Sequence, residues 1–130
     1  MQCVRTVCVL MLFFKLQSIV IMVKYYGYAV ANEWFYQRAV ELGHPHPTTY
    51  NDSIDTIILA SRDVRTETGV YTYTKFRQVK TLKGKLFWCI AFAATDPWEG
   101  LPTSAPPEER YKPLKEALQR EGPPRWFRAP

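Results

Sequence analysis

The chain has 130 residues, enough for one domain but too few for two of ordinary size. Hydrophobic residues make up 47% of it and aromatic residues 15%, which excludes a globally disordered chain. The net charge is +5, and from residue 22 onward 15 basic residues stand against 12 acidic ones. This mild excess lacks the dense positive charge that is typical of a dedicated nucleic-acid-binding face.

The first 21 residues differ from the rest of the chain because they are largely apolar and contain no acid. Arg5 followed by the apolar run 6–14 is typical of a signal peptide, and residues 29–31 offer the small-x-small pattern of a cleavage site. Lys15, however, interrupts the apolar region. In a membrane anchor this lysine would lie near the bilayer centre, at a cost of about 2.5–3.5 kcal/mol.

Three interpretations of this segment stay open: a start of translation at Met22, a targeting signal and a membrane anchor. A start at Met22 is favoured, because helix caps and turn residues begin only after it. The protein is then cytoplasmic, whereas it is secreted if residues 1–31 act as a signal. Along the chain we expect a leader, targeting segment or mis-assigned start over residues 1–21, one domain over 22–122 and a C-terminal tail over 123–130.

Extended and helical patterns alternate in the first half of the domain. Residues 23–30 are rich in aromatic and β-branched side chains, which predicts a strand. Asn32 can cap a helix that runs through residue 42 and places its apolar positions on one face. The loop 44–47 contains two prolines, so it is extended and ends this helix. A second helix is predicted from near Asn51, with acids in its first turn and arginines in its last.

Two more strands follow over residues 70–79 and 86–95, joined by a turn that contains a glycine. The second of them is apolar almost throughout and is therefore expected in the middle of the sheet. Residues 96–107 contain four prolines and form a loop. Pro113 can open a short helix, and the chain beyond residue 122 has an irregular pattern.

These elements predict an α+β fold in the order β-α-α-β-β-α, with an antiparallel sheet of at least three strands and helices packed on one face. The stretch 24–30, the capped helix with Trp34 and the ending 124–127 resemble small uncharacterised fungal proteins. The resemblance covers about residues 22–128. Because such proteins have no activity that could be carried over, the resemblance implies nothing about function.

Aromatic and basic side chains gather in the predicted hairpin, residues 70–95, and no acid occurs between Glu67 and Asp96. The basic residues there include Lys75, Arg77, Lys80, Lys83 and Lys85. Because side chains alternate along a strand, four residues would share one face: Tyr71, Tyr73, Lys75 and Arg77. Such a face could stack bases and neutralise phosphates. The favoured alternative is a solvated sheet edge, on which lysines block pairing with other sheets.

The tail places Trp126 and Phe127 between Arg125 and Arg128. Large aromatic residues and arginine are enriched at the energetic centres of protein interfaces, so this segment is a candidate binding site. The favoured interpretation is that the tail folds back and covers the core of its own domain.

The two histidines, His44 and His46, could hold Zn²⁺ or Cu²⁺ with Asp52 as a third ligand. A closed zinc site needs four ligands and a catalytic one needs three, and the sequence offers no further histidine. A stiff loop is therefore favoured over a metal site. Cys89 lies within an apolar run, which favours a buried thiol over a nucleophile. We expect neither a metal nor another cofactor.

No serine-nucleophile, phosphate-binding or zinc-protease motif occurs in the sequence. The favoured function is a small, non-enzymatic binding or interaction module whose partner is another protein or a second copy of the chain. Two alternatives stay open. One is an enzyme whose site is assembled only in space, and the other is a weak nucleic-acid binder that uses the basic hairpin, residues 70–95. A membrane is not a favoured partner.

Overall fold

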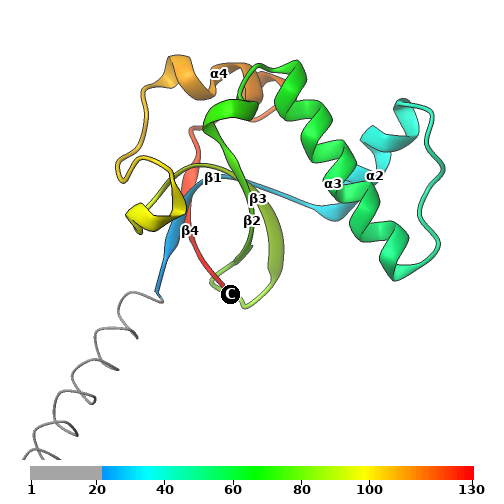
Figure 1. Cartoon of the computed structure of the whole chain (residues 1–130), viewed down its shortest axis with the longest axis horizontal. Helices are drawn as coiled ribbons and strands as arrows, with labels where there is room; N and C mark the ends of the chain where they lie inside the picture. Colours follow the sequence, from blue (N-terminus) through cyan, green and yellow to red (C-terminus); the bar gives the residue numbers. More distant parts are fainter. Residues whose placement is uncertain (1–21) are drawn as a thin grey trace, which may run out of the picture.

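The computed structural model describes residues 22–130, so the predictions about a leader lie outside the described residues. In chain order the elements are β1 (Lys24–Val30), α2 (Asn32–Glu41), α3 (Tyr50–Glu67), the 3-10 helix η1 (Tyr71–Tyr73), β2 (Lys75–Lys80), β3 (Leu86–Ala94), the 3-10 helix η2 (Pro97–Glu99), α4 (Glu108–Ala117) and β4 (Arg125–Arg128) (Figure 1). This confirms the predicted α+β fold and adds one strand to it. No helix within the described range is long and apolar enough to cross a bilayer.

The four strands form one antiparallel sheet in the order β4-β1-β3-β2. β3 lies between β1 and β2, as its nearly continuous apolar sequence predicts. The sheet also closes on itself, because β2 and β4 meet through one residue pair, Lys80 with Arg128. A single residue pair therefore joins the two edge strands. Beside this pair the strands separate, and the inner face of the sheet is accessible from the surface there.

The close approach of β1 to β3 requires a glycine at position 27. The strand register shifts there, since Tyr26 lies opposite Ala93 while Gly27 lies opposite Ala91. A Cβ atom at position 27 would lie 2.0 Å from the carbonyl oxygen of Ile90, far inside contact distance. Only glycine lets the two backbones come this close, and the irregularity helps the sheet to curl.

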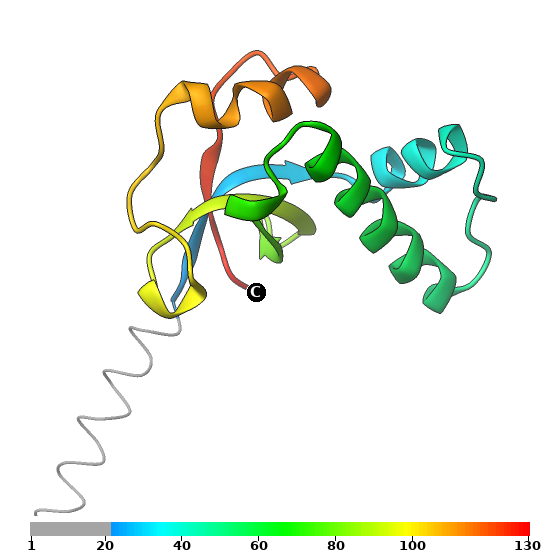
Figure 2. The same ribbon diagram turned by 45° about the horizontal axis from the view of Figure 1, so that its top comes forward.

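The helices pack on one face of the sheet, as predicted. Val30 and Phe92 from the strands belong to the same buried cluster as Phe35 of α2, Val64 of α3 and Leu114 of α4. Figure 2 shows α2 and α3 beside the sheet and α4 above it, away from the C-terminus. The larger core therefore lies between the sheet and its helices.

The opposite face of the sheet turns inward, because the sheet closes on itself. Its buried cluster is smaller and includes Val79, Cys89 and Ala91. The half-buried side chains of Phe87 and Phe127 pack against this cluster. Within residues 22–130, no α-helix contributes a buried residue to it, and its buried residues come from the strands and from one loop residue, Leu101.

Several helix ends differ from the prediction. Ala31 precedes α2, and the predicted cap, Asn32, is already the first helical residue. α3 begins one residue before Asn51 and is capped by Thr49, whose side chain accepts a backbone hydrogen bond. α4 starts at Glu108, so it encloses the proline that was expected to open it. These differences leave the order of elements unchanged.

The first residues of the predicted second strand form η1 instead, so β2 begins only at Lys75. The cause is the buried Arg65 of α3. Its guanidinium donates hydrogen bonds to the hydroxyl and carbonyl oxygens of Thr74 and to the carbonyl oxygen of Tyr71. Because these groups point at one side chain, residues 71–73 turn rather than extend.

The predicted irregular ending is also wrong, because residues 125–128 form β4. This strand pairs with β1 from Lys24 opposite Arg128 to Gly27 opposite Arg125. The two segments lie about a hundred positions apart in the sequence, so no local pattern indicates that they pair. The tail is thus part of the sheet.

Candidate binding site

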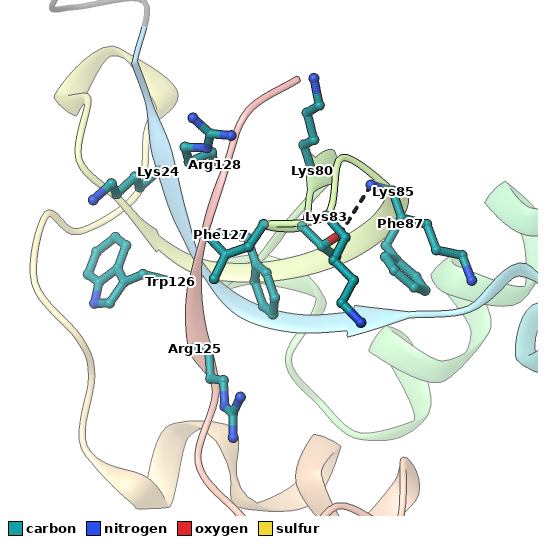
Figure 3. Close-up of a pocket in the computed structure, with 11 residues that line it drawn as sticks. Lys24, Lys80, Lys83, Lys85, Phe87, Arg125, Trp126, Phe127 and Arg128 are labelled. Atoms are coloured by element: carbon teal, nitrogen blue, oxygen red, sulfur yellow. Dashed lines mark hydrogen bonds between the residues drawn. The ribbon is translucent and has the colours of Figure 1, made fainter.

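A groove of about 650 Å³ opens between β4 and the turn that joins β2 to β3 (Figure 3). We call it the cationic groove, and its lining residues are Lys24, Lys80, Thr81, Leu82, Lys83, Lys85, Phe87, Arg125, Trp126, Phe127 and Arg128. They come from β1, the β2–β3 hairpin and β4. The groove therefore unites the two segments that the sequence singled out separately, the basic hairpin and the aromatic tail.

The groove exists because the sheet closes at one point only. β2 and β4 pair through Lys80 and Arg128 and through no other residues. The β2–β3 turn is held in shape by its own hydrogen bonds: the Thr81 N–H donates to the Lys85 carbonyl oxygen (2.8 Å), and the Lys85 N–H donates to the Thr81 hydroxyl (3.1 Å). Gly84 supplies the left-handed backbone conformation of the turn, with φ at +83°.

The floor of the groove is apolar. Figure 3 shows the side chains of Phe87 and Phe127 in the space between β4 and the hairpin. Trp126 lies on the other side of β4, as expected for neighbours along a strand, with its ring centroid 5.2 Å from that of Tyr26. Of the two predicted aromatic residues, Phe127 therefore lines the interior, whereas Trp126 lies at the edge with 39% of its surface exposed.

The surroundings of this floor are positively charged. Six lining residues are basic: Lys24, Lys80, Lys83, Lys85, Arg125 and Arg128. Among the described residues none that lines the groove is acidic, and no salt bridge within residues 22–130 involves any of the six. The ammonium of Lys85 lies 5.2 Å from the centroid of the Phe87 ring. An apolar floor beneath unneutralised cations can hold an anion that carries an apolar group.

The other predicted hairpin residues lie elsewhere, and the prediction that four of them share one strand face is wrong. Tyr71 and Tyr73 belong to η1, whereas Lys75 and Arg77 belong to β2. The Tyr71 ring packs under the guanidinium of Arg65, 4.4 Å from its centroid. Burial lowers the pKa of Arg65. These contacts occupy the aromatic surface that was expected to stack bases.

Tyr73 and Arg77 have structural partners as well. The Tyr73 hydroxyl donates to the carbonyl oxygen of Arg110 (2.9 Å). The Arg77 guanidinium and the Tyr25 hydroxyl both donate to Glu99 Oε1, at 2.9 and 2.8 Å. Burial and the hydrogen bond to Glu99 raise the pKa of Tyr25 to about 12. Burial alone would raise the pKa of Glu99, but the hydrogen bonds from Tyr25 and Arg77 outweigh it and lower that pKa. This network fastens η2 to the sheet.

The histidines lie in the loop between α2 and α3. His44 and His46 line a shallow pocket together with Asp52 and Asp55. His46 packs against Tyr36, with 5.3 Å between the ring centroids. Within the described range, no group of three or more histidine, cysteine, aspartate or glutamate side chains is close enough together to hold a metal ion. The loop therefore gives no structural support to a metal site.

Cys89 is fully buried in the inner core, and burial raises the pKa of its thiol. The thiolate that a nucleophile requires is thus disfavoured. The candidate residues that the structure does bring together are Lys83, Lys85, Trp126 and Phe127.

Seven lining residues were not predicted as site residues: Lys24, Lys80, Thr81, Leu82, Phe87, Arg125 and Arg128. Arg125 and Arg128 flank the aromatic pair, and four others belong to the basic hairpin, so six of the seven lie in the two segments that the sequence indicates. Lys24 carries no such signal, because only the pairing of β1 with β4 brings it to the groove. No family model matches the chain, and no curated protein or solved structure shows significant similarity to it.

Proposed function

We propose that this domain is a non-enzymatic binding module that holds an amphipathic anion in the cationic groove. The ligand class is an anionic head group, such as a phosphate or carboxylate, attached to an apolar chain. One observation carries the proposal: six cations without a salt-bridge partner among residues 22–130 line the same groove as Phe87 and Phe127. The charges would contact the head group while the floor buries the chain.

The size of the groove supports a small ligand. Its volume of about 650 Å³ lies within the range of about 300–1,000 Å³ that is usual for small-molecule sites. The chemistry of the lining supports binding rather than catalysis. Among the residues that line the groove there is no carboxylate, imidazole or thiol that could act as a general base beside the lysines or Thr81 and activate them as nucleophiles.

A single-stranded nucleic acid is the second candidate, because phenylalanine rings beside lysines and arginines also suit stacked bases and phosphates. The half-buried state of Phe87 and Phe127 favours the amphipathic anion over it. An apolar chain can lie along the exposed edge of such rings, whereas a stacked base needs an open ring face.

The proposal is tested by titrating the full chain with alkyl phosphates of increasing length, from butyl to octyl, and measuring the dissociation constant by calorimetry. Each methylene buried on the floor is worth about 0.8 kcal/mol, so affinity should rise about four-fold per added carbon until the groove is filled. Affinity that does not depend on chain length would show that charge alone is recognised and would refute the proposed class.

Charge is tested with a matched pair of variants. Lys83 and Lys85 line the groove and are exposed, so replacing both by glutamine should weaken octyl phosphate binding without affecting the fold. Lys112 of α4 is equally exposed and lies outside the groove, so Lys112→Gln should bind as the wild type does. Equal affinity of all three proteins would place the ligand elsewhere.

A further inference from the structure

We propose that the β2–β3 turn docks the domain onto an anionic membrane surface, with Leu82 entering the lipid interface and the lysines of the turn contacting head groups. This inference rests on the proposed function, because the same groove lysines would bind the anionic head groups. It adds that a membrane presents those head groups. Its own evidence is different, because it rests on apolar side chains that the fold exposes at one end of the molecule.

Leu82 lies at the apex of the turn with 98% of its surface exposed. The turn does not depend on it, because the closing hydrogen bonds join Thr81 to Lys85 and Gly84 to Thr81. Isolated exposed leucines are common and need no function. Leu82 differs in its neighbours, since Lys80, Lys83 and Lys85 surround it in the sequence and all line the cationic groove with it.

Two further apolar side chains are exposed at this end of the domain, Met22 (63%) and Trp98 (91%). Figures 1 and 2 place the start of β1, η2 and the β2–β3 turn toward the same end, away from α4. Hydrogen bonds confirm that η2 lies beside β1, because Lys24 and Thr95 exchange backbone and side-chain bonds immediately before η2 begins. Exposed apolar side chains, which we call the apolar tips, thus come from three separate segments: the start of β1, η2 and the β2–β3 turn.

The charge at this end suits an anionic surface. Lys24 and the turn lysines are not paired with acids within residues 22–130. Of the two acids of the η2 region, Glu99 pairs with Arg77, whereas Asp96 accepts a hydrogen bond from the Trp98 N–H (3.0 Å) and keeps its negative charge. Exposed cations therefore outnumber free acids where the apolar tips lie.

A bilayer surface is a partner that meets both requirements together, with anionic head groups above an apolar interior. A nucleic acid would offer the charge but no apolar interior for Leu82 and Trp98. Basic clusters next to apolar segments are typical of binding to anionic lipids.

The test is co-sedimentation of the full chain with vesicles of phosphatidylcholine, with and without phosphatidylserine. Residues 1–21 are the same in every variant, so differences between variants report on the domain alone. Lys83→Gln should lower the partition coefficient on phosphatidylserine vesicles about five-fold, and Leu82→Ser about ten-fold. Matched controls are Lys112→Gln and Tyr50→Ser, which remove an exposed lysine and a 79% exposed apolar side chain from α4 and α3. Both controls should partition as the wild type does.

Three results would overturn the inference. If Leu82→Ser partitions as Tyr50→Ser does, Leu82 does not enter the bilayer. Partitioning of the wild type that does not respond to phosphatidylserine would exclude recognition of anionic lipid. Binding of a thymidine oligonucleotide that is lost in Lys83→Gln but kept in Leu82→Ser would assign the lysines to nucleic acid. If octyl phosphate still binds the groove in any of these cases, the proposed function stands and only the membrane partner is wrong.

Discussion

Replacing Phe127 by alanine removes a side chain that serves both the inner core and the groove floor. The residue is half-buried and packs against the cluster that contains Val79 and Cys89. Phe→Ala at fully buried sites costs about 3–5 kcal/mol, so a half-buried ring should cost about 2 kcal/mol of unfolding free energy. With a urea m-value of about 1–3 kcal/mol/M for a small domain, the midpoint should fall by about 1 M.

The same substitution should flatten the dependence of affinity on alkyl chain length, because part of the apolar floor is gone. Tyr50→Ala is the matched control, since it removes an exposed aromatic side chain of α3 that does not line the groove. It should leave the chain-length dependence unchanged. Urea unfolding followed by circular dichroism and calorimetric titration measure the two effects. A Phe127→Ala protein with wild-type stability, or an equal loss of affinity in Tyr50→Ala, would refute this account of the floor.

Substitutions and titrations away from the groove test the rest of the structure. Gly27→Ala should lower the unfolding free energy by at least about 2 kcal/mol, because its Cβ would lie 2.0 Å from the Ile90 carbonyl oxygen; an unchanged melting temperature would contradict the close approach of β1 and β3. The pKa of Glu99 is lowered in the folded protein, so its carboxylate stabilises the fold at pH values above the ordinary pKa of a glutamate. This stabilisation is lost as the pH falls through the pKa of Glu99 in the folded state. Glu99→Gln should therefore lose less stability than the wild type when the pH is lowered from about 5 to 3. The pKa of Tyr25 is raised to about 12, so the stability that this phenol contributes is lost between about pH 10 and 12, and ultraviolet titration should show its ionisation later than that of an exposed tyrosine.

The sequence predicts the fold where local patterns decide it. The periodicity of α2, the terminal charges of α3 and the apolar run of β3 indicate these elements correctly, because each depends on residues within a short stretch. β3 is also placed correctly in the middle of the sheet, since only a central strand can be apolar on both faces. The errors concern segments whose conformation depends on distant residues.

Two such segments decide the candidate site. The sequence 70–74 has strong strand propensity, but the buried Arg65 draws its backbone oxygens into a turn, which removes Tyr71 from the face that was expected to bind. Residues 125–128 were predicted to be irregular, yet they pair with the edge of β1 that β3 leaves free. The pairing of Lys24 with Arg128 brings a charged residue of β1 to the groove, and no pattern within either segment indicates this.

Nuclear magnetic resonance of the isotope-labelled full chain, titrated with octyl phosphate, tests the central claim most directly. The proposed function predicts saturable shifts of amide signals that are confined to residues 80–87 and 125–128 and to Lys24, the residues that surround the cationic groove. Lys83→Gln combined with Lys85→Gln should move the titration to higher ligand concentration without changing which signals shift. Shifts that centre on the loop between α2 and α3, or that never saturate, would contradict the claim that the groove is the binding site.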